Sequence, residues 1–175
     1  HPGKLVNNDG SGAWVGGMAG GALMLDGVDD YVTIPGFKGV TGMRSRSCMA
    51  WIKTAGVDGQ ILSWGTNATG QKWVVRVNGN GTLRAEVQNG WVYGTTVIND
   101  GQWHHIAVVL DSDGTPTVTD VRLYVDGVLD AVNSYAMSSI DTGSDQDVTV
   151  GAFLPLPNYF AGLLDDVRIY DYAVS

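Results

Sequence analysis

Charged and aromatic side chains alternate with apolar ones along three consecutive segments of the chain, 72–78, 82–88 and 91–97. Trp91 and Tyr93 belong to the polar set, and their rings can stack on the apolar C–H faces of sugars. The set also includes Lys72 and Thr95, and four further members can hydrogen-bond sugar hydroxyls: Arg76, Arg84, Glu86 and Gln88. Both arginines can also pair bidentately with a uronate or a sulfate. The set therefore favours glycan binding, and the alternative is a solvated sheet face with a ladder of charges.

Two more aromatic residues, Trp64 and Tyr159, lie in or near expected loops. Tyr159 follows the segment 154–158, where two prolines and an asparagine indicate an exposed loop. We expect both residues to line the rim of a glycan site on the sheet face.

The polar set shares one face only if the three segments form a meander. Asn89-Gly90 predicts a two-residue type I′ turn, which would pair Gln88 with Trp91, Glu86 with Tyr93 and Arg84 with Thr95. A three-residue loop at 79–81 would pair Val77 with Leu83 and Val75 with Ala85, a register that joins apolar residues. The opposite face of the meander then faces the core and carries Trp73, Val75, Val77, Leu83, Ala85, Val87 and Val92.

The rest of the chain has the same short, turn-bounded segments. Strands are expected at 22–25, 30–34, 47–53, 60–64, 72–78, 82–88, 91–97, 103–110, 121–125, 128–132, 147–152 and 160–170. Asp126-Gly127 predicts a second type I′ turn, with Val125 opposite Val128. No stretch has a convincing helical period, so the pattern predicts an all-β sandwich or barrel.

Length and composition suit one domain over 1–175, in which residues 1–20 form an irregular, Gly-rich opening segment. Hydrophobic residues make up 44% of the chain, yet no apolar run reaches the length of a membrane span. The first residue is His1 rather than Met, which indicates a fragment or a mature form of a larger multidomain protein.

The net charge of −8 repels phosphate backbones and argues against a nucleic-acid partner. Glu86 is the only Glu among 18 acidic residues, and the others are Asp, a turn residue and an oxygen ligand for Ca²⁺.

Cys48 is the only Cys and is expected to be a buried thiol. His104 and His105 are adjacent on a strand and point to opposite faces, so they cannot chelate one metal together.

Five segments in order resemble one family: ALMLDGVDDYVTIP (22–35), SCMAWIK (47–53), DGQWHHIAV (100–108), LYVDG (123–127) and FAGLLDDVRIY (160–170). They are similar to laminin G-like jelly-roll domains of the concanavalin A-like lectin/glucanase superfamily. The resemblance covers residue 22 to the end of the chain. It implies a two-sheet antiparallel β-sandwich of about six or seven strands a sheet, with a concave outer face on one of them.

The resemblance also implies a structural Ca²⁺ near the sheet edge, between an early strand and the last one. The matching positions are Asp26 and Asp165, and Asp29 and Asp166 are near alternatives. The alternative is that Asp26 and Asp29 only cap turns.

Enzymes of the same fold are the main rival to a binding module. The retaining glucanases among them resemble each other in a Glu-x-Asp-x-Glu strand, and a single Glu cannot supply that motif. A Gly-x-Ser-x-Gly nucleophile elbow is also missing. We therefore predict a non-catalytic, secreted or cell-surface module of the kind found in bacterial multidomain proteins, monomeric in isolation, that binds a polysaccharide or another glycan. Protein–protein adhesion is the alternative, and a polysaccharide-degrading enzyme is the second.

Overall fold

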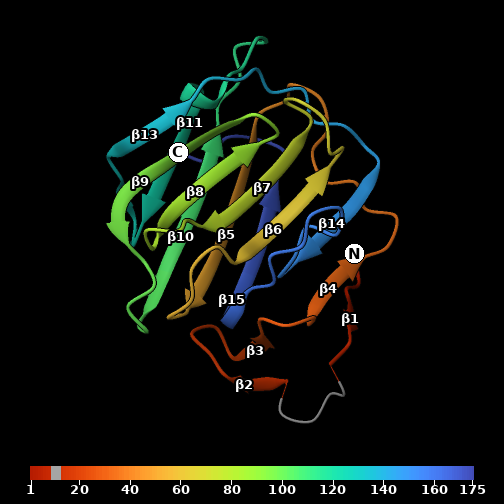
Figure 1. The fold of residues 1–175 in the computed structure, drawn as a ribbon, viewed down its shortest axis with the longest axis vertical. Coiled ribbons are helices and arrows are strands. Elements are labelled where there is room, and N and C mark those ends of the chain that lie inside the picture. The colour runs from red at the N-terminus through yellow and green to blue at the C-terminus, as the bar shows by residue number, and fades with distance from the viewer. Residues whose placement is uncertain (9–12) are drawn as a thin grey trace.

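Two antiparallel β-sheets stack face to face in the computed structural model of the chain, which describes residues 1–8 and 13–175 (Figure 1). The described strands are β1 (Lys4–Val6), β2 (Trp14–Gly16), β3 (Gly21–Asp26), β4 (Tyr31–Ile34), β5 (Arg46–Lys53), β6 (Gln60–Gly65), β7 (Lys72–Val77), β8 (Thr82–Val87), β9 (Gly90–Val97), β10 (Trp103–Leu110), β11 (Val121–Val125), β12 (Val128–Leu129), β13 (Val132–Ala136), β14 (Gln146–Val150) and β15 (Ala161–Tyr170). A short 3₁₀ helix, η1 (Val118–Asp120), precedes β11. The described part of the chain has no helix of the length and apolarity needed to cross a membrane.

Eight strands form the first sheet in the order β1-β4-β14-β6-β7-β8-β9-β13. Seven strands form the second sheet in the order β12-β11-β10-β5-β15-β3-β2. The predicted all-β sandwich is confirmed, and each described sheet is as large as expected or slightly larger. In Figure 1 the first sheet lies toward the viewer, and β5, β10 and β15 of the second lie behind it.

The hydrophobic core fills the space between the sheets. All seven inward residues predicted for the meander are buried in it: Trp73, Val75, Val77, Leu83, Ala85, Val87 and Val92. Cys48 of β5 reaches the same core from the second sheet, and burial raises the pKa of its thiol to about 12. The thiol is therefore protonated and shielded at neutral pH.

The β7–β8 register is the predicted one, with Val77 opposite Leu83 and Val75 opposite Ala85. The β8–β9 register differs from the prediction by two residues, because Glu86 lies opposite Trp91 and Arg84 opposite Tyr93. Gly90 pairs with Val87 instead of serving as a turn residue, and only Asn89 of the Asn-Gly pair has a positive φ, 63°. A Cβ on Gly90 would lie 2.3 Å from the Ser138 Cβ, so close packing of this segment requires the glycine inside the strand.

A slip of two residues leaves every side chain on its predicted face. Trp91, Tyr93, Arg84 and Glu86 therefore still share the outer face of the first sheet. Thr95 does not lie opposite Arg84, because a bulge follows Tyr93, and the carboxylate of Asp130 accepts hydrogen bonds from the Thr95 N–H and hydroxyl.

The segment 128–132 is not the single strand that the pattern predicted. It divides at the buried Asp130, with β12 pairing in the second sheet and β13 in the first. Asp130 ends β12 through its contacts with Thr95 and Thr96, which tie it to β9. The Asp126-Gly127 turn is as predicted, with both φ angles positive and Val125 opposite Val128.

The opening segment 1–20 is less irregular than predicted, although its residues 9–12 lie outside the described part. β1 adds to the edge of the first sheet through β4, and β2 adds to the edge of the second through β3. Three-residue edge strands are too short to produce a readable alternation in the sequence.

The connection 151–160 lies against the outer face of the first sheet. The Gln60 side chain holds it, because the Gln60 Oε1 accepts from the N–H groups of Phe153 (2.7 Å) and Asn158 (2.9 Å). Ser63 of β6 donates its hydroxyl to the Ala152 carbonyl. The loop therefore crosses β6 and divides the outer face into two parts.

Candidate functional site

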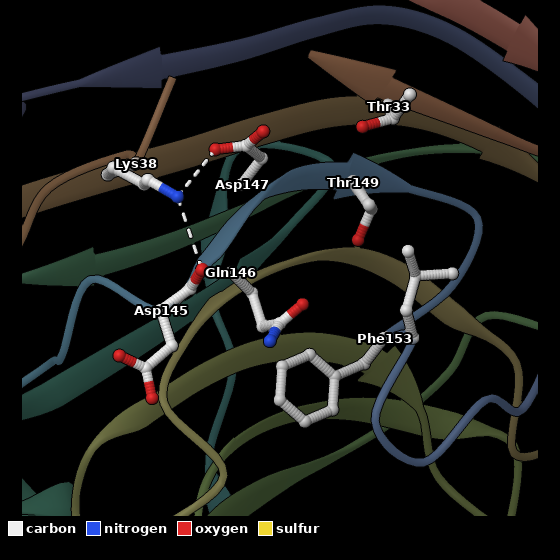
Figure 2. Close-up of a pocket in the computed structure, with 8 residues that line it drawn as sticks. Thr33, Lys38, Asp145, Gln146, Asp147, Thr149 and Phe153 are labelled. Atoms are coloured by element: carbon white, nitrogen blue, oxygen red, sulfur yellow. Dashed lines mark hydrogen bonds and ion pairs between the residues drawn. The ribbon is translucent and has the colours of Figure 1, made fainter. Parts of the chain in front are cut away.

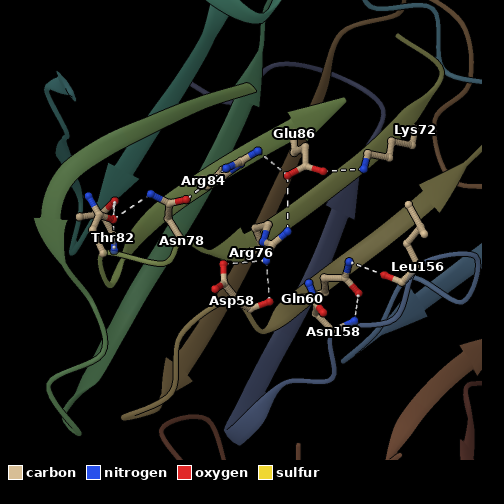
Figure 3. Close-up of polar contacts among 11 residues, drawn as sticks. Asp58, Gln60, Lys72, Arg76, Asn78, Thr82, Arg84, Glu86, Leu156 and Asn158 are labelled. Carbon is tan, nitrogen blue, oxygen red and sulfur yellow. Dashed lines mark hydrogen bonds and ion pairs between the residues drawn. The ribbon is translucent and has the colours of Figure 1, made fainter. Parts of the chain in front are cut away.

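One part of the outer face lies over β7, β8 and β9 and carries most of the predicted binding residues. Strand pairing places Arg76, Arg84 and Tyr93 in one row across it. The neighbouring row contains Glu86 and Trp91. Figure 3 shows the charged members of this surface converging on Glu86.

Trp91 and Tyr93 form an aromatic pair on this face. Their ring centroids lie 5.2 Å apart and their planes differ by 24°, a stacked arrangement. The Arg84 guanidinium lies 5.0 Å from the centroid of the Trp91 ring, as in a cation–π contact. Both rings are half-buried, so each keeps accessible surface. We call Trp91, Tyr93 and Arg84 the aromatic platform.

Glu86 binds three cations beside the platform. Lys72 Nζ lies 2.5 Å from Oε1, and Oε2 has Arg84 Nη2 at 2.7 Å and Arg76 Nη1 at 3.5 Å. Arg76 also pairs with Asp58 Oδ1 at 2.9 Å. These five residues, which we call the Glu86 cluster, hold three cations and two anions, so this part of an acidic protein has a local positive excess.

Burial and charge act in opposite directions on the Glu86 carboxyl. Burial alone would raise its pKa, but the hydrogen bond from Lys72 and the charges of Arg84, Lys72 and Arg76 hold the pKa below its usual value. Burial lowers the pKa of Arg84, and the nearby Glu86 opposes that shift. Glu86 is therefore ionised at neutral pH and cannot serve there as a proton donor.

The remaining predicted ligand residues are placed differently. Arg76 is buried and used within the cluster, whereas Gln88 is half-buried at the end of β8. Tyr159 is half-buried, and its ring lies 6.3 Å from that of Tyr31. Tyr31 begins β4, which is five strand positions from β9 in the sheet, or roughly 24 Å. Tyr159 is therefore not part of the aromatic platform.

Trp64 was expected at the rim of the site, and this expectation is wrong. Its side chain is 0% exposed, and its ring packs against that of Trp73 at 6.1 Å. The indole N–H donates to the Val40 carbonyl at 3.0 Å. Because β6 continues to Gly65, Trp64 is an inward strand residue rather than a loop residue.

Three carboxylates gather where β3 turns into β4. Asp26, Asp29 and Asp30 each offer an oxygen, and these oxygens lie within 4.8 Å of one another. Asp26 Oδ1 accepts the Val28 N–H at 2.8 Å, so the predicted turn-capping role is also present. Among the described residues, none of the three carboxylates has a Lys or Arg ion pair. This set of hard oxygens fits a cation such as Ca²⁺.

Asp165 and Asp166 do not join this group. Asp26 lies opposite Ala161, whereas Asp165 follows Leu164, which lies opposite Leu23, so Asp165 is several residues away along β3. Asp165 is buried and accepts the Ala19 N–H at 2.7 Å, and Asp166 pairs with Arg168. The acidic group joins two predicted residues, Asp26 and Asp29, with Asp30, which the sequence pattern had assigned only to a strand.

The adjacent histidines have separate surroundings. The His105 ring packs edge-on against Trp51 at 5.2 Å. His104 lies between two carboxylates, with Nδ1 2.8 Å from Asp126 and Nε2 3.1 Å from Asp100. Burial would lower the pKa of His104, but the hydrogen bonds to Asp126 and Asp100 outweigh it, and the pKa is raised.

We expect His104 to make stability pH-dependent. A raised folded-state pKa means that its contribution is complete below about pH 6.5 and is lost as the pH rises through the folded pKa. The contribution of such a half-exposed pair is about 1 kcal/mol or less. His104→Gln should therefore reduce the melting temperature at pH 5.5 more than at pH 8.5, measured by calorimetry. An equal reduction at both pH values would show that the imidazolium does not contribute.

Three residues at these sites carried no usable signal in the sequence. Lys72 fell on the polar face but was not distinguished from solvated lysines. Asp58 lies in a loop, and only the fold brings it to Arg76. Asn78 reaches Arg84 at 3.2 Å from the β7–β8 loop.

The two stacked antiparallel sheets define a jelly-roll sandwich, and comparison with known proteins gives its family. A laminin G-type family model, described as the concanavalin A-like lectin/glucanases superfamily, matches residues 26–175. The chain therefore belongs to this superfamily, as the sequence resemblance indicated.

Curated relatives include the protein named "Sushi, von Willebrand factor type A, EGF and pentraxin domain-containing protein 1" of Rattus norvegicus and of Mus musculus. Each is 26% identical over 168 residues, which covers 86% of this chain but 4% of the relative. The chain thus corresponds to a small part of these proteins.

Similar solved structures support the fold. A protein of Bacteroides ovatus, provisionally described as carbohydrate-binding, has a TM-score of 0.60 and 22% identity over 83% of this chain and 42% of that one. Domains LG4-5 of the mouse laminin alpha1 chain give 0.56 and 18%, covering 83% and 40%. The pentraxin of Limulus polyphemus gives 0.56 and 17%, covering 88% and 77%.

Proposed function

We propose that this chain is a non-catalytic carbohydrate-binding module. The observation that carries the proposal is the aromatic platform, in which Trp91 and Tyr93 stack on each other and Arg84 lies over the Trp91 ring. A sugar ring needs an apolar surface for its C–H face and directional partners for its hydroxyls. The platform and the adjoining Glu86 cluster supply both within two neighbouring rows of one sheet.

The relatives are consistent with this proposal. The Bacteroides ovatus neighbour is described provisionally as carbohydrate-binding, and the family description includes lectins. The curated relatives are named for several kinds of domain, which supports a role as one module of an extracellular multidomain protein. We propose a monomer for the isolated module.

The state of Glu86 supports a binding rather than a catalytic role. A glycosidase needs one carboxyl that is protonated at working pH and a second one opposite it. Glu86 is the only Glu, and three cations hold its pKa low. Asp58, the other carboxylate of the cluster, is bound by Arg76.

A glycan array on the purified protein tests the proposal directly. Binding to polysaccharides or oligosaccharides that is lost in Trp91→Ala supports a glycan ligand on the platform. No binding by a folded sample, across neutral, uronate and sulfated glycans, would overturn the proposal.

The tip of the loop 151–160 favours a protein partner as the second candidate. Leu156 is 50% exposed and Leu154 is also exposed, next to the face that the loop crosses. Laminin, a structural neighbour, shares this fold. Partner capture that survives Trp91→Ala but is lost in Leu156→Ser would favour adhesion over glycan binding.

We further propose that Asp26, Asp29 and Asp30 hold Ca²⁺. Three mutually close carboxylates without a basic partner among the described residues repel one another, and a divalent cation relieves this repulsion. Backbone carbonyls of the turn would complete the ligand set. The cation would then brace the turn between β3 and β4.

Calcium should raise the melting temperature. At a concentration 100-fold above Kd the expected gain is about 2.7 kcal/mol, or roughly 5–10 °C for a chain of this size. Asp29→Asn should remove most of the gain, because it takes a charged oxygen ligand away from the site. The substitution should change stability little without calcium, because the Asp29 carboxylate makes no hydrogen bond among the described residues. Asp171→Asn, an exposed site at the far end of the chain, is the matched control. An equal calcium response in both variants would contradict this site.

A further inference from the structure

The outer face of the first sheet has a second polar feature, a pocket bordered by the loop 151–160. Its volume is about 160 Å³, and it lies over β4 and β14 (Figure 2). The lining residues are Thr33, Lys38, Asp145, Gln146, Asp147, Thr149, Phe153 and Leu154. No prediction from the sequence pointed to this pocket.

An ion pair fixes one wall of the pocket. Lys38 Nζ lies 2.8 Å from Asp147 Oδ1 and donates to the Asp145 carbonyl at 3.1 Å. The Gly36 N–H donates to the other Asp147 oxygen at 2.9 Å. These hydrogen bonds hold the pKa of Asp147 below its usual value, so the group stays an acceptor.

Other polar groups of the pocket remain available for a ligand. Within the described part of the chain, the Thr33 hydroxyl, the Gln146 amide and the Asp145 carboxylate have no hydrogen bond or ion pair. Lys38 has a third N–H to donate beyond its two contacts. The available groups therefore include donors, acceptors and groups that can do both.

We propose that this pocket binds one neutral, hydroxyl-rich sugar unit. Each sugar hydroxyl donates and accepts, as this mixed set of groups requires, and the exposed Leu154 side chain offers apolar surface for a C–H face. This inference rests on the proposed glycan-binding function and names the class of sugar that the pocket would take.

The charge of the pocket excludes other ligands. Two carboxylates and one ammonium leave a net negative charge, which repels a uronate or a sulfate. The Lys38 ammonium already lies against Asp147 Oδ1, so this oxygen is not free to bind a metal ion. The aromatic platform has the opposite local charge, so the two parts of the face would prefer different sugars.

Phe153 lies between the two parts of the face. Its ring borders the pocket and lies 5.7 Å from Lys72 Nζ of the Glu86 cluster, and both side chains are buried. The loop 151–160 therefore separates the pocket from the platform.

Saccharide titration followed by ¹⁵N–¹H NMR of the whole chain tests the pocket. The probes are the methyl glycosides of glucose, galactose, mannose and N-acetylglucosamine, with methyl glucuronide and glucose 6-sulfate as charged counterparts. We expect at least one neutral glycoside to shift the amides of Lys38, Gln146 and Thr149, and the charged sugars to bind at least about tenfold more weakly. Gln146→Ala and Thr33→Val should weaken binding about fivefold to tenfold. Gln102→Ala, the same change at an exposed distant position, should have no effect.

The possible outcomes separate this inference from the proposed function. Shifts confined to Trp91 and Tyr93, or binding that Gln146→Ala leaves intact, would overturn the pocket and leave the glycan-binding function standing. Tighter binding of the charged sugars at the pocket amides would overturn the stated class. The absence of shifts at both places, together with an empty glycan array, would overturn both proposals.

Discussion

Trp91→Ala is expected to weaken glycan binding by roughly 30-fold or more, which corresponds to about 2 kcal/mol for the loss of a central aromatic contact. The Trp91 ring contacts two neighbours, since Tyr93 stacks on it and Arg84 lies over it. Removing the ring therefore eliminates a stacking surface and also releases the two groups that contact it. Isothermal titration calorimetry with the best array ligand measures the loss.

Two variants make this result specific. Trp91→Phe keeps an aromatic face and should stay within about threefold of the parent affinity. Trp14→Ala removes a tryptophan that is 68% exposed on β2 of the other sheet, so it should not change binding. Melting temperatures of the three variants control for folding. An equal loss of affinity in Trp14→Ala and Trp91→Ala would place the ligand elsewhere or indicate nonspecific adsorption.

The residues of the outer face could be predicted because successive side chains of a strand point to opposite faces, whatever the exact pairing with the neighbouring strand. The β8–β9 register was off by two residues, yet an even slip keeps Trp91, Tyr93 and Glu86 on their face. What the sequence could not supply was which residues lie side by side. Trp91 lies opposite Glu86 rather than Gln88, and this pairing brings Arg84 close to the Trp91 ring.

Contacts between distant segments were beyond the reach of local patterns. The loop 151–160 divides the face because Gln60 holds it, and nothing in the loop sequence indicates that partner. Asp58 reaches Arg76, and Asp30 joins Asp26, only through the folded turns. The family resemblance suggested Asp165 as a partner of Asp26, but the observed register separates them along β3.

Glu86→Gln should lower the free energy of unfolding by about 3 kcal/mol, a typical cost of removing one partner from a buried ion pair. The Glu86 side chain is only 12% exposed and is, in the described part of the chain, the one carboxylate that contacts Lys72, Arg76 and Arg84 together. Glutamine keeps the size but removes the charge and adds donors. The cluster cannot accommodate more donors, because the buried Nε groups of Arg76 and Arg84 already lack an acceptor among the described residues. Urea unfolding at pH 7 measures the difference.

The stability that the Glu86 carboxylate contributes should depend on pH in a definite direction. The folded-state pKa of Glu86 is depressed, so its contribution is complete above the unfolded value of about 4.5 and is lost as the pH falls through the folded pKa. The stability difference between the parent and Glu86→Gln should therefore be largest at pH 6–7 and shrink below about pH 4.5. Asp58→Asn is the control, because its carboxylate pairs with Arg76 but is 56% exposed, and it should cost less than about 1 kcal/mol.

Equal and small losses in Glu86→Gln and Asp58→Asn would contradict a desolvated cluster, and the face would then be the solvated charge ladder that the sequence left as the alternative. A large loss confined to Glu86→Gln would mean that the cations beside the aromatic platform are held in place before any ligand arrives. Arg84 would then present its guanidinium to a glycan without having to be ordered on binding, which reduces the entropic cost of association.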